Sequence, residues 1–154
     1  MAPRREDDPH QPSGETLQFM QTIWNLGHAL DVRSKRMAKT LGVTGPQRLV
    51  IRVIGQSPEL TASEIAATLG LHPSTLSGVL SRLQTHGFLE RQVDAADRRR
   101  VRFKLTASGR RIDALRKGTV EAAVRRSLAR ADATAVEGTK TMLALLIEEL
   151  VKVD

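Results

Sequence analysis

Five basic side chains fall within seven positions, from Arg98 to Lys104, and follow a short acidic stretch that contains Asp94 and Asp97. Guanidinium groups bind phosphate oxygens and the guanine edge through paired hydrogen bonds. The run is therefore compatible with a surface that binds nucleic acid. It is also compatible with a solvated surface, a processing site or a localisation signal, and the elements that position these side chains separate these interpretations.

The basic run lies on a predicted β-hairpin. We expect its strands at 88–93 ("FLERQV") and 100–105 ("RVRFKL"). Successive side chains of a strand point to opposite faces. The apolar residues Val101, Phe103 and Leu105 therefore share one face, and the basic residues between them share the other. The sequence thus predicts one face packed on a core and one basic face directed outward.

The tip of this hairpin carries Arg98 and Arg99, with Arg100 beside them. A tip arginine can enter a narrow minor groove, where the negative potential is concentrated. We expect Asp94 and Asp97 to cap the turn and to pair with a neighbouring arginine that they orient. The alternative is an exposed edge strand that its positive charge protects from pairing.

A helix-turn-helix motif is predicted directly before the hairpin, over 62–81. Ala66 must be small because the second helix crosses over it, and Gly70 supplies the positive φ of the tight turn. Apolar side chains at the other fixed positions would hold the two helices at a set angle. The alternative is an ordinary helical hairpin in a core. The helix-packing positions are Ile65, Leu69, Leu71, Leu76 and Val79.

The second helix of the motif has a face of small hydroxyl side chains and one glycine, opposite an apolar face of Leu76, Val79, Leu80 and Leu83. A glycine costs a helix about 1 kcal/mol relative to alanine. Small residues allow the backbone to approach a DNA groove, and hydroxyls bind phosphates or base edges. The alternative is a surface where small residues are tolerated. The predicted DNA contacts on this helix are Ser74, Thr75, Ser77, Gly78, Ser81 and Arg82.

The flanking segments are predicted to be helical and to dimerise. Helices with capping boxes begin after Thr44 and Thr61, one long helix is expected over 107–130, and a last helix begins at Asp132 or Thr134. The terminal helices carry more apolar surface than one small domain covers. The fold class is thus mainly α, within α+β. The expected parts are a disordered tail (1–14), a dimerisation helix (15–43), a winged helix-turn-helix domain (44–105) and C-terminal dimerisation helices (106–154).

The composition restricts the classes of function. The 154 residues carry 24 Lys and Arg against 17 Asp and Glu, a net charge of +7, which favours a polyanionic partner. The absence of cysteine excludes disulfides and thiol chemistry. The four scattered histidines form no metal-ligand spacing, and no enzyme motif is present, so we expect no enzyme, cofactor or metal. Without a secretory or membrane-spanning segment, a cytoplasmic protein is expected.

The segment 60–109 resembles the MarR-type (multiple antibiotic resistance regulator) transcription factors. "DAADRRRVRFKLTASG" is similar to the wing signature of that family, although Ala95 stands where members commonly have proline. The resemblance spans roughly 15–151 and implies a homodimer on double-stranded DNA with a pseudo-palindromic operator. It also implies that 72–86 is the recognition helix, and that Asp97 and Arg99 are the paired aspartate and tip arginine of the wing.

The resemblance further implies a repressor that responds to a small molecule bound between the dimer helices and the winged lobe. Trp24 and His28 lie one turn apart on the first helix and are the candidate pocket residues. The alternative is that Trp24 belongs to the core or the dimer seam. An alternative function of another class is a winged-helix module that binds RNA or a protein partner.

Overall fold

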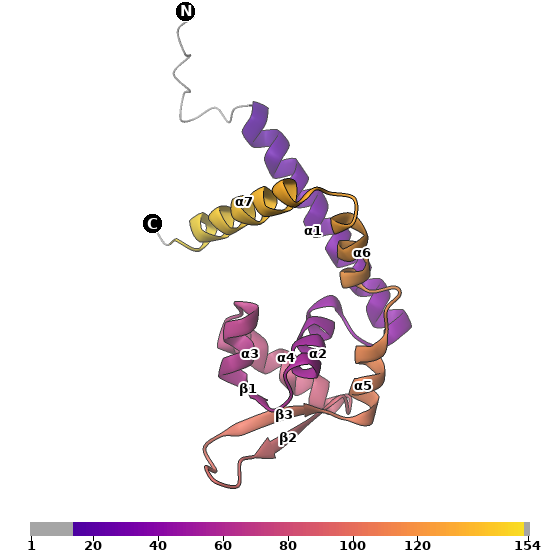
Figure 1. Ribbon diagram of the computed structural model, residues 1–154, viewed down its shortest axis with the longest axis vertical. Coiled ribbons are helices and arrows are strands. Elements are labelled where there is room, and N and C mark those ends of the chain that lie inside the picture. The colour runs from indigo at the N-terminus through magenta and orange to yellow at the C-terminus, as the bar shows by residue number, and fades with distance from the viewer. Residues whose placement is uncertain (1–13, 153–154) are drawn as a thin grey trace, which may run out of the picture. The chain divides into compact units, whose positions relative to one another are not determined.

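The computed structural model describes residues 14–152, which form seven helices and one three-stranded sheet and divide into two compact units (Figure 1). The second unit begins at Arg116 and contains α6 (Val120–Leu128) and α7 (Ala133–Val151). The first unit ends at Leu115 and contains α1 (Gly14–Leu41), α2 (Gly45–Gln56), β1 (Leu60–Thr61), α3 (Ala62–Leu69), α4 (Pro73–Thr85), β2 (Leu89–Val93), β3 (Val101–Leu105) and α5 (Ala107–Ala114).

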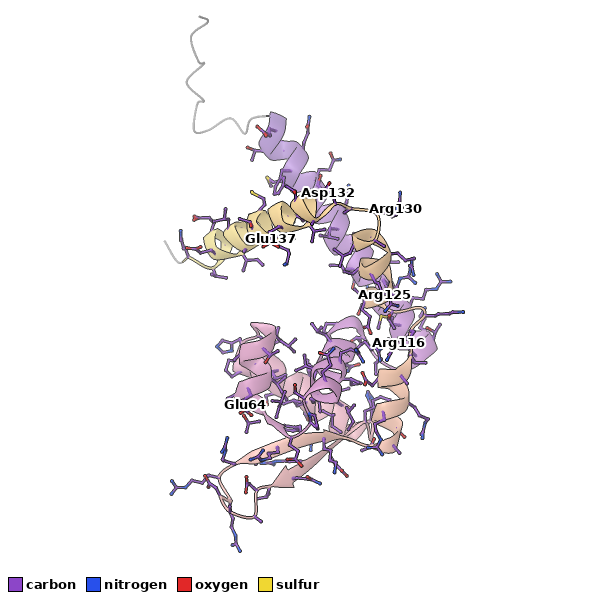
Figure 2. The ribbon with its side chains drawn as sticks, viewed as in Figure 1. Glu64, Arg116, Arg125, Arg130, Asp132 and Glu137 are labelled. Atoms are coloured by element: carbon purple, nitrogen blue, oxygen red, sulfur yellow. The ribbon has the colours of Figure 1, made fainter. Side chains whose placement is uncertain are left out.

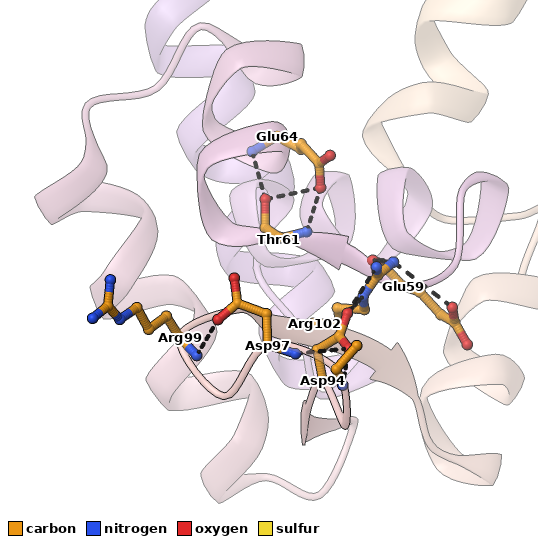
Figure 3. Close-up of polar contacts among 8 residues, drawn as sticks. Glu59, Thr61, Glu64, Asp94, Asp97, Arg99 and Arg102 are labelled. Atoms are coloured by element: carbon orange, nitrogen blue, oxygen red, sulfur yellow. Dashed lines mark hydrogen bonds and ion pairs between the residues drawn. The ribbon is translucent and has the colours of Figure 1, made fainter.

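Both predicted capping boxes are present. The Thr44 N–H donates to Gln47 Oε1 at 2.9 Å, and the Gln47 N–H donates to Thr44 Oγ1 at 3.4 Å. Thr61 and Glu64 form the same reciprocal pair at the start of α3 (Figure 3). The hydrogen bonds from Thr61 also hold the pKa of the Glu64 carboxyl below its ordinary value. These bonds satisfy the N–H groups that the first turn of a helix leaves without partners.

The sheet has three strands, one more than the sequence predicts. The strand order is β1-β3-β2, and every pair is antiparallel. β2 and β3 form the predicted hairpin, in which Leu89 pairs with Leu105 and Val93 with Val101. β1 adds Leu60 beside Phe103 on the other edge of β3. A strand of two residues is too short to show an alternating pattern, so sequence reasoning missed β1.

The core of the first unit lies between α2, α3, α4 and the sheet. Ala66 is buried, as its small side chain at the helix contact requires, and Gly70 has a φ of 61°. The apolar face predicted for α4 is buried except at Val79, which is only partly buried. Phe103 and Leu105 of β3 are buried, so the predicted core face of the wing is confirmed. The fully buried aliphatic side chains include Val50, Ile51, Ile54, Ile65, Leu76 and Leu83.

The single helix predicted over 107–130 is wrong. α5 ends at Ala114, Leu115 is extended, and Gly118 has a φ of 76°. Thr119 then starts α6 by accepting a hydrogen bond from the Ala122 N–H at 3.2 Å. Leu115 thus ends α5 in an extended conformation, Gly118 turns the chain, and the threonine cap begins a new helix. This local signal outweighs the apolar spacing that continues across the break.

A helix lies near each end of the described residues. α1 begins at Gly14 and ends at Leu41, before Gly42 with its φ of 76°. The tail predicted over 1–14 otherwise lies outside the described residues. In the second unit, Asp132 caps α7 by accepting from the Ala135 N–H at 2.9 Å, and Figure 2 shows it at the start of that helix.

Candidate nucleic-acid interface

The predicted recognition helix, α4, presents its small polar face to solvent. Its opposite face is fixed in the core by Leu76, Leu80 and Leu83. A side chain added at Gly78 would meet nothing within 4 Å, so no internal packing requires a glycine there. The face is available to a ligand, because all its residues are exposed: Ser74, Thr75, Ser77, Gly78, Ser81 and Arg82.

The first turn of α4 depends on His72. Pro73 occupies the first helical position, where a backbone N–H would have no acceptor within the helix, so its absence costs no hydrogen bond. His72 Nδ1 accepts a hydrogen bond from the Ser74 N–H at 3.3 Å and lies 2.7 Å from Ser74 Oγ. This residue therefore caps the helix and also contacts the first residue of the polar face.

The turn at the tip of the wing is ordered by Asp94. One carboxylate oxygen, Oδ1, accepts from the N–H of Ala96 at 2.8 Å and of Asp97 at 3.4 Å. The Asp94 N–H donates to Arg100 O, and the Arg100 N–H to Asp97 O, both at 2.9 Å. The hydrogen bond from the Ala96 N–H, and to a smaller extent the one from the Arg102 side chain, hold the pKa of Asp94 below its ordinary value. The carboxylate is therefore ionised at neutral pH and holds the turn.

Asp97 supports the tip through the backbone. Its Oδ1 accepts a hydrogen bond from the Arg99 N–H at 3.0 Å (Figure 3). The expected pair between a wing aspartate and an arginine side chain is instead formed by Asp94 and Arg102. Asp97 thus fixes the chain at Arg99 and leaves the guanidinium of Arg99 unrestrained.

Arg102 is a structural member of the wing that sequence reasoning assigned only to the outward basic face. Its Nη2 and Nε lie 3.0 and 3.2 Å from Asp94 Oδ2, and its Nη1 donates to Glu59 O at 3.4 Å. Glu59 has a φ of 70°, the only positive value of a non-glycine residue among residues 14–152. Arg102 therefore links the wing turn to the α2–β1 turn. The alternation of charges along β3 does not reveal this, because Glu59 is 43 residues away.

The three arginines predicted at and beside the tip are exposed. Within residues 14–152, the side chains of Arg98, Arg99 and Arg100 form no ion pair and no hydrogen bond. They differ in this from Arg102, which is half-buried and paired. A cluster of unpaired guanidinium groups on a projecting hairpin (Figure 1) is suited to bind phosphates.

A surface groove connects the helix face with the wing. Ser77 and Ser81 of α4 line one side, and Arg91, Val101 and Phe103 of the sheet line the other. Two of the predicted α4 contacts, Ser77 and Ser81, therefore lie beside the strands of the wing, whereas Arg98, Arg99 and Arg100 at the wing tip do not line this groove.

The candidate pocket residues on α1 are both at the surface. Trp24 is 68% exposed and His28 is exposed. In the part of the chain that the structure describes, no three His, Asp or Glu side chains gather as a metal site, and no helix has the length and hydropathy to cross a bilayer.

The fold and this interface define a winged helix-turn-helix protein. The MarR family model matches residues 41–100, which span the end of α1 to the wing tip. The chain is 30% identical over 124 residues to the HTH-type transcriptional repressor Rv2887 of Mycobacterium tuberculosis, a match that covers 80% of this chain and 89% of that one. The chain belongs to the MarR family, and it is a DNA-binding transcriptional regulator.

Solved structures agree with this fold. The MepR–DNA complex of Staphylococcus aureus has a TM-score of 0.70 at 21% identity, covering 86% of this chain and 97% of that one. PcaV of Streptomyces coelicolor, in complex with its natural ligand, has a TM-score of 0.67 at 23% identity, covering 96% and 98%. The predicted winged helix-turn-helix architecture is therefore confirmed.

Proposed function

We propose that this protein is a cytoplasmic, ligand-responsive repressor that binds a pseudo-palindromic operator as a homodimer, with α4 in the major groove and the wing tip in the adjacent minor groove. The observation that carries the proposal is the groove that Ser77 and Ser81 of α4 line together with Arg91 and Val101 of the wing strands. One lobe of such a dimer would contact both grooves of a half-site.

Dimerisation through the ends of the chain is supported by exposed apolar side chains on α1 and α7. None of the residues of α7, from Ala133 to Val151, is buried. A helix that exposes several large apolar side chains is a candidate interaction site. The exposed apolar residues include Leu17, Met20, Trp24 and Leu30 on α1, and Leu145, Ile147 and Leu150 on α7.

The effector in this proposal is a small molecule that binds at α1, where Trp24 and His28 provide an aromatic surface and a hydrogen-bonding ring. Trp24 is 68% exposed in the single chain, so its indole is available to a ligand or to a second protomer. The chain contains no cysteine, so a thiol-based signal cannot act on it.

Footprinting of the full chain on the DNA that flanks its own gene tests the proposal. We expect two protected half-sites whose centres are about 34 Å apart, one helical turn of DNA. Binding should weaken steeply as the salt concentration rises, because neutralised phosphates release counterions. Equal affinity for unrelated duplexes and for RNA would instead favour the interaction module.

Replacing Arg99 with alanine is expected to weaken operator binding about tenfold to hundredfold while leaving the melting temperature unchanged. Asp97 holds the backbone of Arg99, and the guanidinium has no partner within the described chain. Titration of a labelled operator at several salt concentrations measures the loss.

Arg130→Ala is the matched control for this charge change, because Arg130 is exposed at the connection between α6 and α7 (Figure 2) and lies outside the wing. It should reduce operator affinity by less than about twofold. Unchanged binding by a folded Arg99→Ala protein would contradict the assignment. A larger loss for Arg98→Ala than for Arg99→Ala would assign the minor groove to Arg98.

A further inference from the structure

His72 and Ser74 form a hydrogen-bonded pair at the first turn of α4, and this pair bears on which bases the helix reads. The inference rests on the proposed function, because it requires α4 to lie in the major groove. His72 Nδ1 is 3.3 Å from the Ser74 backbone nitrogen and 2.7 Å from Ser74 Oγ. One ring nitrogen therefore contacts both the backbone and the side chain of Ser74.

The direction of the shorter bond follows from the cap. Nδ1 accepts the Ser74 N–H, as the capping position requires, and a neutral imidazole nitrogen that accepts carries no proton. In the tautomer that this cap requires, with the imidazole hydrogen on Nε2, the 2.7 Å contact is a hydrogen bond that the Ser74 hydroxyl donates to Nδ1. The Ser74 hydroxyl thereby donates its only hydrogen to His72. Toward a ligand, it can only accept hydrogen bonds through its oxygen lone pairs.

Ser77 and Ser81 provide the comparison on the same face. Within residues 14–152, neither hydroxyl has a hydrogen-bond partner, so each can donate or accept. A serine hydroxyl of that kind binds a phosphate or either class of base edge. Ser74 differs, because it can only accept. It cannot donate to a phosphate oxygen, to guanine O6 or to thymine O4.

We infer that Ser74 is a specificity-determining residue that accepts a hydrogen bond from an exocyclic amino group, adenine N6 or cytosine N4, at one base pair of each half-site. His72 is a positioning residue that acts through Ser74 by fixing the hydroxyl direction. In the major groove, adenine and cytosine present these donors, whereas guanine and thymine present acceptors at the corresponding edge. At this position the protein therefore discriminates amino bases from keto bases on one strand.

Selection from a library of random DNA duplexes tests the inference, with the full chain and five variants. For the wild type we expect one position per half-site with an amino-over-keto preference of about three- to tenfold. Ser74→Ala and His72→Ala should each reduce that preference to less than about twofold, and only at that position. In the Ser74→Ala background, His72→Ala should cause no further change in base preference.

His72→Asn is the conservative control, because asparagine is a good capping residue whose side-chain oxygen accepts hydrogen bonds. It should retain the amino preference. Ser77→Ala should leave this position unchanged. Base ratios, unlike total affinity, are insensitive to a weaker helix cap.

The outcomes separate this inference from the proposed function. If the wild type selects a sequence but His72→Ala keeps every base ratio, or if Ser74→Ala alters no position, the inference is overturned and the proposed function stands. A keto preference at the position that Ser74→Ala affects also overturns it. A wild-type protein that selects no duplex sequence overturns the proposed function and this inference with it.

Discussion

Replacing Arg48 with alanine is expected to lower the free energy of unfolding by about 3 kcal/mol, because it removes a buried side chain and leaves three partly buried carbonyl oxygens without their donor. Arg48 lies on α2 and is 1% exposed. Its guanidinium donates to Ile112 O, to Asp113 O at 3.2 Å and to Leu115 O at 2.7 Å. The last carbonyls of a helix have no intrahelical partner. Urea denaturation followed by circular dichroism, at one fixed protein concentration, measures the loss.

Arg52→Ala is the control for the same region. Arg52 lies one turn further along α2, and its Nη1 is 2.6 Å from Asp113 Oδ1. Its side chain is 26% exposed, so water screens this ion pair. The expected loss is about 1 kcal/mol or less. Equal losses for the two variants would show that the contacts of Arg48 with the end of α5 are not the reason for its importance.

Replacing Gly109 with alanine is expected to destabilise the protein by about 3 kcal/mol, the upper range for overpacking a core. The added Cβ would lie well inside van der Waals contact of the Phe88 carbonyl oxygen, which belongs to the backbone and has no freedom to rotate away. The same oxygen accepts the Thr106 N–H at 3.1 Å. Thermal denaturation of the purified variant measures the effect, and an unchanged melting temperature would contradict the close approach.

Gly78→Ala is the matched control, because it makes the same substitution in a helix of the same unit where an added Cβ meets nothing within 4 Å. It should raise the free energy of unfolding by up to about 1 kcal/mol. Its affinity for the operator should fall several-fold, since the new methyl group would face the DNA groove in the proposed function.

Much of the first unit could be predicted from sequence because its signals are local. The Thr44 and Thr61 capping boxes, the turn glycine Gly70 and the strand alternation around Phe103 each lie within a few residues of what they determine. Each was confirmed by the structure. The resemblance to the MarR family and the winged helix-turn-helix fold were confirmed as well. The roles of individual residues in DNA binding stay predictions.

The features that could not be predicted join distant segments or interrupt a pattern. Arg48 bonds to backbone oxygens 64 to 67 residues away, and carbonyls have no sequence signature. Strand alternation places Arg102 on the basic face of β3, but it does not predict the contacts of this side chain with Asp94 and Glu59. The break before α6 did have a local signal, since Gly118 is unfavourable inside a helix and Thr119 is a good capping residue. The apolar spacing of Ile112 and Val120 obscured that signal.

The hydroxyl of Thr106 donates to Gly87 O at 2.6 Å, across the two ends of the wing hairpin. Together with the bond from the Thr106 N–H to Phe88 O, it closes the chain between these residues into a loop that is fastened at its base. A change in the length or sequence of 95–99, which leaves the contact between Asp94 and Arg102 intact, is then contained within the loop and leaves the end of α4 and the start of α5 in place. The wing tip is therefore the part of this protein that can vary, by mutation or by design, without a change in the scaffold that carries it.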